Sequence, residues 1–413
     1  MWSTLAGKII RMKVMDIMTG SKKNIESYSG GKYLSYVLAL FIGLLIFSHN
    51  AQATIACEPS TRFPAITIVP NVTVSSSTAG NDLPLGSTIY SLQNGYSVST
   101  LGIYCDAPFT VGLDMRTTSM PSGAPTMMNT LYGNVPVFPT NVAGVGVVIW
   151  KNGNSSNKYF LTSTIVDSNT AISHDSAGDS GIGPHVKYFG LALVKTGPIA
   201  SGAVVNGSSF PHWVWDVRAQ SGYSGLPITV LTASYTGTST FVTKTCTTPA
   251  STVVDLGKYD VTDATFSGPG VTTKWVDSSI VLNNCPEFSG YHGYSGYQTI
   301  DGSGAPTDGS RTANIFTISV SPANSVSGNV IGLDAVAGAA SGVGVQLGYT
   351  PGDISAAATS PTTIWTAGET WDLTPPAAGG TVKIPLAARY YQTASKITPG
   401  IANTQVVINI YYK

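Results

Sequence analysis

The 413-residue sequence contains little charge, because only 10% of its residues are Asp, Glu, Lys or Arg. Lys and Arg together number 21, as do Asp and Glu, so the formal net charge is zero. No basic stripe marks a nucleic-acid surface, and we predict no nucleic-acid partner. After residue 53 there are also no long stretches of Leu, Glu, Lys and Ala at helical spacing. This absence, together with a composition rich in Gly, Ser, Thr and Val, predicts an all-β protein.

The first 53 residues have the pattern of an export signal. They contain six of the 21 basic residues and two of the 21 acidic ones, which leaves 15 basic and 19 acidic residues after cleavage. An apolar run at residues 33–47 is followed by Ala51-Gln52-Ala53, a small-residue cleavage site. A membrane anchor is the alternative, but the run is short for a membrane span. We interpret residues 1–53 as a signal peptide, with Met12, Met15 and Met18 as alternative starts.

Only four cysteines occur, and no two have the C-x-x-C spacing of a metal site. An even number of cysteines in an exported chain indicates disulfides. Three pairings are possible. The local pairing joins Cys57 to Cys105 and Cys246 to Cys285, with one bridge in each half, and we predict that pairing.

The exported region is predicted to form two β-sandwich domains. Residues 54–242 contain short apolar runs, such as 145–150 and 228–235, that are separated by Gly, Pro, Asn and Ser. Residues 235–245 are small and polar, and we place the domain boundary there. The predicted domains are therefore 54–242 and 243–413, and we expect the first to fold without help from the second.

The last residues of the chain have the pattern of a half-buried strand. Val406, Ile408, Ile410 and Tyr412 alternate with other residues and so fall on one face of a strand that continues to Lys413. Such a strand belongs inside a sheet or at an edge that must be covered.

The C-terminal half resembles a type 1 fimbrial pilin domain in five motifs that occur in order. They are Val254-Asp255-Leu256-Gly257, the segment 275–286 around Trp275 and Cys285, residues 341–347, residues 384–390, and the terminal strand that follows Gly400. The resemblance implies an immunoglobulin-like sandwich that lacks its last strand. In that family a periplasmic chaperone fills the groove first, and the N-terminal extension of an adjoining subunit fills it later. By this resemblance, Gly400, Val406, Ile408, Ile410 and Tyr412 would line the groove for the chaperone and the donor strand.

One departure from that family predicts the function. An ordinary pilin has a short donor extension at the place where this chain has residues 54–242. Such a subunit accepts a strand but has none to give, which is the arrangement of a two-domain tip adhesin of the chaperone–usher route. The segments 55–57 and 214–219 resemble parts of the lectin-like domain of the mannose-binding type 1 tip adhesin, but its sugar-binding residues are not matched.

The resemblance implies a route and a set of partners. The chain is expected to pass through the periplasm and an outer-membrane usher to the fimbrium tip at the cell surface. There it would join an adjoining fimbrial subunit and bind a host or surface receptor, which we expect to be a glycan. The alternative is a structural cap or initiator subunit that binds no receptor.

We predict the receptor site in the polar segment 167–187. Its candidate ligand-binding residues are His174, Asp175, Asp179 and His185, more than a connector needs. No cofactor is expected, and the alternative is Zn²⁺ held by His174, His185 and His212. No H-x-H or H-x-x-x-H pair would preform such a zinc site.

Catalysis is not predicted. Gly178-Asp179-Ser180-Gly181 matches the nucleophile motif of chymotrypsin-like proteases, but a triad needs a histidine base. That family's base lies upstream of the motif, and the only histidine before residue 174 is His49, in the predicted signal peptide. We interpret the motif as a polar turn.

Two aromatic patterns have structural interpretations. Trp213 and Trp215 share one face of a strand, and their size favours burial, which leaves His212 and Asp216 on the outer face. The aromatic segment 291–297 is expected to be a loop or a contact with the adjoining subunit.

Overall fold

The structure, a computed structural model, describes residues 54–97, 101–151, 158–182, 186–243, 245–261, 264–293, 298–300, 306–307 and 309–413, and the predicted signal peptide lies outside them. Within these residues all regular structure is β except two 3₁₀ turns, Gly207–Ser209 and Ala264–Phe266. No helix in the described ranges is long and apolar enough to cross a membrane. The prediction of an all-β fold is confirmed.

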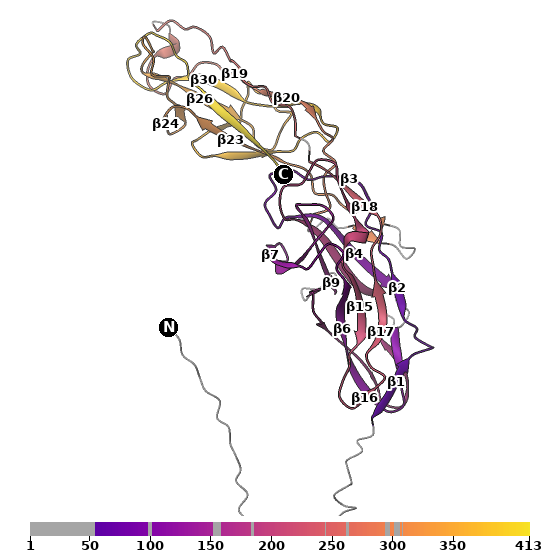
Figure 1. The fold of residues 1–413 in the computed structure, drawn as a ribbon. Coiled ribbons are helices and arrows are strands. Elements are labelled where there is room, and N and C mark those ends of the chain that lie inside the picture. The colour runs from indigo at the N-terminus through magenta and orange to yellow at the C-terminus, as the bar shows by residue number, and fades with distance from the viewer. Residues whose placement is uncertain are drawn as a thin grey trace, which may run out of the picture. The chain divides into compact units, whose positions relative to one another are not determined.

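Strands β1 to β18 are drawn in indigo to pink in Figure 1 and come from the N-terminal half. They are β1 (Ile55–Pro59), β2 (Ile66–Ile68), β3 (Val74–Thr78), β4 (Thr88–Ser97), β5 (Leu101–Cys105), β6 (Phe109–Ser119), β7 (Thr126–Thr130), β8 (Gly133–Pro139), β9 (Val145–Lys151), β10 (Tyr159–Phe160), β11 (Val166–His174), β12 (Gly178–Ile182), β13 (Val186–Lys195), β14 (Ala203–Asn206), β15 (His212–Val217), β16 (Tyr223–Ser224), β17 (Ile228–Ala233) and β18 (Thr238–Val242). Their sheets have the orders β11-β6-β15-β17-β2, β12-β5-β1-β16, β14-β18-β3 and β4-β13-β9-β8-β7, with β10 beside β9.

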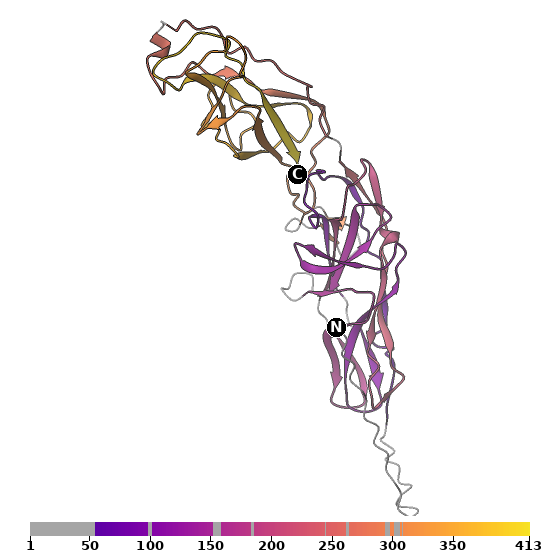
Figure 2. The same cartoon turned by 60° about the vertical axis from the view of Figure 1, so that its left-hand side comes forward.

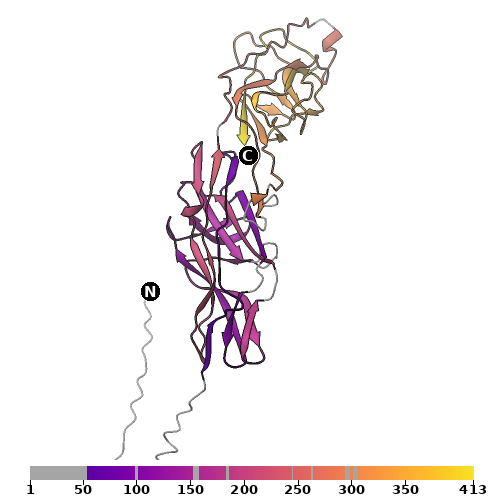
Figure 3. The same ribbon diagram turned by 90° about the vertical axis from the view of Figure 1, so that its right-hand side faces the viewer.

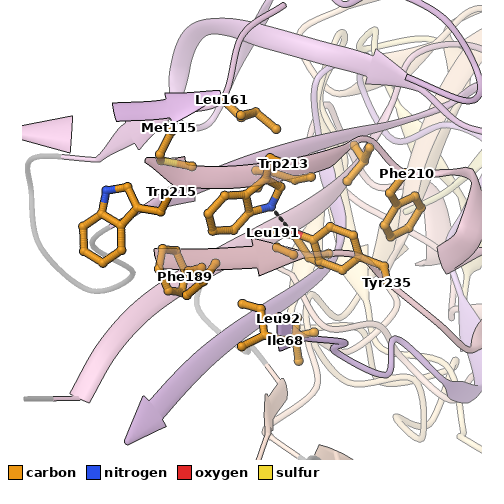
Figure 4. Close-up of a cluster of buried hydrophobic side chains, with 14 of the residues drawn as sticks. Ile68, Leu92, Met115, Leu161, Phe189, Leu191, Phe210, Trp213, Trp215 and Tyr235 are labelled. Atoms are coloured by element: carbon orange, nitrogen blue, oxygen red, sulfur yellow. Dashed lines mark hydrogen bonds between the residues drawn. The ribbon is translucent and has the colours of Figure 1, made fainter. Parts of the chain in front are cut away.

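The core of this half is rich in aromatic side chains. Trp213 and Trp215 on β15 are fully buried, as the alternation along this strand predicted, and Phe189 on β13 packs against both (Figure 4). Trp213 also donates a 3.0 Å hydrogen bond from its indole N–H to the hydroxyl of Tyr235. The buried indole N–H of Trp213 therefore has a hydrogen-bond partner. An unsatisfied donor in a core would cost free energy of folding.

Strands β19 to β31 come from the C-terminal half and are drawn in pink to yellow (Figure 3). They are β19 (Val276–Asp277), β20 (Ile280–Cys285), β21 (Gln298–Ile300), β22 (Pro306–Thr307), β23 (Phe316–Pro322), β24 (Val326–Ser327), β25 (Val330–Ile331), β26 (Val343–Tyr349), β27 (Thr363–Ile364), β28 (Thr370–Leu373), β29 (Gly380–Ile384), β30 (Ala387–Gln392) and β31 (Val406–Tyr412). The sheet orders are β19-β30-β26-β25-β24, with β27 beside β26, then β20-β29 and β28-β23-β31. A second, separate core contains Phe316, Trp365 and Trp371.

Both predicted disulfides are present, and none of the four cysteines is free. Cys57 on β1 lies opposite Cys105 on β5, so the first bridge joins neighbouring strands of one sheet. Cys246 and Cys285 form the second bridge at the start of the C-terminal half. On the chain-entropy model, loops of this size contribute about 4 kcal/mol each.

Candidate functional site

The terminal strand β31 lies at the edge of a three-stranded sheet in the C-terminal half. It pairs antiparallel with β23, from Phe316 opposite Tyr412 to Pro322 opposite Val406. No described strand pairs with its other edge, and Figure 2 shows it as the yellow arrow that ends at the C-terminus. The predicted alternation is confirmed, because Ile408 and Ile410 pack against the core whereas Val407 is 60% exposed.

Residues 251–260 of the same half belong to no strand. Leu256 packs against the same core as β31, but Val253 is 95% exposed. Only Val254 and Leu256 among these ten residues are partly buried, and the other eight are exposed. A strand edge without a described strand partner and an unpaired segment thus adjoin the same core.

A cavity of about 350 Å³ lies beside the residues that precede β31. Its lining includes Tyr259 from the unpaired segment, Tyr390 from β30, and Gly400 and Ile401 from the residues that precede β31. The rings of Tyr259 and Tyr390 meet edge to face at 6.1 Å, and burial raises the pKa of Tyr390. The cavity can accept an apolar side chain of an extended segment.

Gly400, singled out from the sequence, has a packing role beside this cavity. A Cβ atom at this position would overlap the backbone of Gly338 and Ala339. The close approach lets Ile401 form a bridge with Ala339 just before β31 begins. Glycine is therefore required here for close backbone packing.

In the N-terminal half, the predicted polar loop 167–187 consists mostly of two strands of different sheets, β11 beside β6 and β12 beside β5. The prediction of a loop was wrong because a strand with one buried face needs only every second residue to be apolar. Val166 and Ile172 meet that need on β11. Asp167 at its start pairs with Arg218, and this guanidinium holds the pKa of Asp167 below its usual value.

Three of the four predicted ligand-binding residues lie on β11, on β12 or in the turn between them. His174 ends β11, where its ring stacks on Phe109 at 6.3 Å. Asp175 is exposed in the turn, and Asp179 on β12 accepts a 2.6 Å hydrogen bond from the Ser60 hydroxyl. His185 lies outside the described residues.

The turn between β11 and β12 lies at one end of the sheet that contains β11. His174 is opposite Phe109 at the start of β6, whereas the link to the C-terminal half leaves beyond β17, near the other end of β6. Figure 1 likewise shows β1 and β16 at one end of this sandwich and β3 and β18 at the other. The exposed turn therefore lies at the end of the sheet opposite the link.

The alternative of one zinc ion held by His174, His185 and His212 is wrong, because two of these residues lie far apart. His174 lies opposite Phe109 and His212 lies opposite Ser119, at the two ends of β6. Ten residues of strand separate two such positions by roughly 30 Å. Ligands of one zinc ion must lie within a few ångströms of one another. In the described part of the chain, no three His, Cys, Asp or Glu residues could hold a metal ion.

Two other candidate side chains have structural partners. Asp216 is on the predicted outer face, but it is only 4% exposed and pairs with Arg116 at 2.8 Å. The hydroxyl of Ser180, in the protease-like motif, donates to the backbone carbonyl of Ser173 at 2.7 Å. This motif lies on strand β12 rather than in the predicted turn.

Comparison with known proteins identifies a family for the C-terminal half. Residues 234–413 match the family model for fimbrial proteins, so this region is a fimbrial domain, as its five motifs predicted. No curated protein sequence matches the chain.

Solved structures to which the chain is similar include several adhesins. The CupB6 tip adhesin of Pseudomonas aeruginosa is 12% identical over 87% of this chain and 95% of its own, with a TM-score of 0.31. The receptor-binding domain of the adhesin MrkD1P of Klebsiella pneumoniae is 18% identical over 47% of this chain and 98% of its own, with a TM-score of 0.28. The ambient temperature fimbriae adhesin AtfE of Proteus mirabilis is 16% identical over 44% and 99%, with a TM-score of 0.25.

Proposed function

We propose that the chain is the receptor-binding tip adhesin of a chaperone–usher fimbria and is not an enzyme. Residues 1–53 are its cleaved signal peptide, residues 54–242 its receptor-binding domain, and residues 243–413 its incomplete pilin domain. The observation that carries this proposal is the edge of β31 that pairs with no described strand, in a region that also contains the unpaired residues 251–260 and matches the fimbrial family.

In this proposal β31 and residues 251–260 are the two walls of a groove that accepts a strand from another chain. From Val406 to Ile410 the edge of β31 that faces away from β23 offers backbone N–H and C=O groups, and Val406, Ile408 and Ile410 remain half-exposed. At Tyr412 this edge is occupied, because the Tyr412 N–H donates to the Asp82 carboxylate at 2.8 Å and the Tyr412 carbonyl accepts from the Asp82 N–H at 3.1 Å. A strand from a periplasmic chaperone, and later one from the adjoining fimbrial subunit, pairs with this edge and covers the apolar face. Burying the remaining surface contributes on the order of 1 kcal/mol for each of these side chains.

The N-terminal end of the exported chain has no strand to donate. After cleavage behind Ala53, residues Ile55–Pro59 form β1, which already pairs with both β5 and β16. Cys57 is also bonded to Cys105. A subunit that accepts but does not donate can only end a fibre, so the usher places it at the tip, where the N-terminal half meets a surface glycan or another receptor.

Labelling of intact fimbriae tests this position. With gold-tagged antibody against residues 54–242, we expect one particle at one end of each fimbria. The same fimbriae labelled against the major subunit should carry particles along the shaft. Labelling by the antibody against residues 54–242 at positions along the shaft would contradict the proposal, because a subunit within the shaft must donate a strand to its neighbour.

A further inference from the structure

A short segment of the C-terminal half packs into the core of the N-terminal half. The side chain of His292 is fully buried, and its ring lies 6.2 Å from that of Tyr90, nearly perpendicular to it. The neighbouring Tyr291 packs against the N-terminal core. Ser91 on β4 donates a buried 2.8 Å hydrogen bond to the carbonyl of Gly293.

The same segment continues into a strand that extends the sheet of the N-terminal half. β21 pairs in parallel with β4, with Gln298 opposite Leu92 and Ile300 opposite Asn94. β22 then pairs with the outer edge of β21. Without these two strands, β4 would be the edge of its sheet and would present unpaired backbone groups.

The base of this segment is fixed by hydrogen bonds to Thr78, at the end of β3. The Thr78 N–H donates to the Gly290 carbonyl at 3.1 Å, and its hydroxyl donates to the Glu287 carbonyl at 3.0 Å. The amide of Asn314 donates to the Thr78 carbonyl at 2.6 Å and accepts from the Gly290 N–H at 3.0 Å. Thr78 and Asn314 are both buried, so these bonds are shielded from water.

We propose that residues 289–293 and β21, here called the strap, act as an internal donor strand for the N-terminal half. The strap supplies one buried side chain and one sheet strand that residues 54–242 do not contain. The N-terminal half therefore reaches its full stability only when the fimbrial half of the same chain is folded, which departs from the expectation that residues 54–242 fold without help from the second domain. Tyr291 and His292, at the start of the aromatic segment, pack against the chain's own first half, and residues 294–297 of that segment lie outside the described residues.

The coupling follows from the position of the strap in the chain. It lies between Cys285, which is bonded to Cys246, and β23, which pairs with the terminal strand. Both flanks of the strap are therefore held by the fold of the fimbrial half. If the fimbrial half unfolds, the strap loses its anchorage and β4 becomes an exposed edge.

Two variants of the mature full-length chain test the strap. In the first, Gln298→Pro and Thr299→Pro are combined. Successive N–H groups of a strand point to opposite edges, so one of the two prolines removes a donor that faces β4. The matched control is Gln298→Ala with Thr299→Ala, which keeps both N–H groups. The second variant is His292→Ala, and its control is His212→Ala at a half-exposed position.

Hydrogen exchange and thermal unfolding are the readouts. In the double-proline variant we expect those amides of residues 92–94 that face β21 to lose at least tenfold in protection, while the amides of β31 keep theirs. His292→Ala opens a cavity in the core and should lower the melting temperature of the N-terminal half by roughly 4–8 °C. Both controls should behave like the parent chain.

Either of two results would contradict the proposed role of the strap. One is unchanged protection at residues 92–94 in the double-proline variant, and the other is an unchanged melting temperature in His292→Ala. Loss of protection at β31 together with residues 92–94 would equally contradict it, because the damage would then lie in the fimbrial half itself.

Discussion

Deleting residues 405–413 is expected to abolish accumulation of the exported chain in the periplasm. The deletion removes β31, all seven of its pairings with β23, and one wall of the groove. Val406, Ile408, Ile410 and Tyr412 contribute roughly 1.5–3 kcal/mol each when buried. Their sum is comparable to the total stability of about 5–15 kcal/mol that a domain has. The truncated chain should therefore escape chaperone capture and be degraded, which an immunoblot of periplasmic extract measures.

Full-length variants separate the two faces of this strand. Ile408→Ser with Ile410→Ser should reproduce the loss, because both side chains pack against the core. Val407→Ser with Tyr411→Ser changes only outward-facing residues and should accumulate normally. Normal accumulation of the truncated chain would refute the assignment of β31 to the strand-accepting groove.

Replacing His174, Asp175, Asp179 and His185 together by alanine is expected to abolish adhesion without unfolding the N-terminal half. The first two residues are at the turn between β11 and β12, at the end of the β11 sheet opposite the link to the fimbrial domain. They contribute hydrogen-bonding and charged groups that suit a polar receptor such as a glycan. Adhesion of labelled bacteria to a receptor-bearing surface measures the effect, and thermal unfolding of the purified chain checks the fold.

One hydrogen bond of β12 needs its own control. Asp179 accepts from the Ser60 hydroxyl, so its replacement removes a contact between β12 and the segment after β1. Ser60→Ala removes the same contact and keeps the carboxylate, and this variant should adhere normally. Binding of the fourfold variant with unchanged affinity would place the receptor site elsewhere.

The sequence predicted those features that depend on short-range patterns. The terminal strand has strict alternation over seven residues, and a period of two determines which face is buried. Trp213 and Trp215 followed the same rule and are buried. The local disulfides were predictable because each pair lies within one half of the chain.

Features that depend on register between distant segments were not predictable. The distance between His174 and His212 is set by their places along β6, which neither residue's neighbours in the sequence reveal. Asp216 has the expected orientation, but Arg116 and Thr229 cover it, so it is not free to bind a sugar. The strap was missed for the same reason, since β21 and β4 are far apart in the sequence and pair only in the fold.

The measurement that tests the account most directly is receptor binding by the mature chain on an array of glycans and host matrix proteins, with and without a chelator. The mature chain should be used because the strap joins its two halves. We predict binding to a small set of related glycans that is unchanged by the chelator and absent from the fourfold variant. Silence on every surface would contradict the account and would favour a structural cap that only ends the fibre.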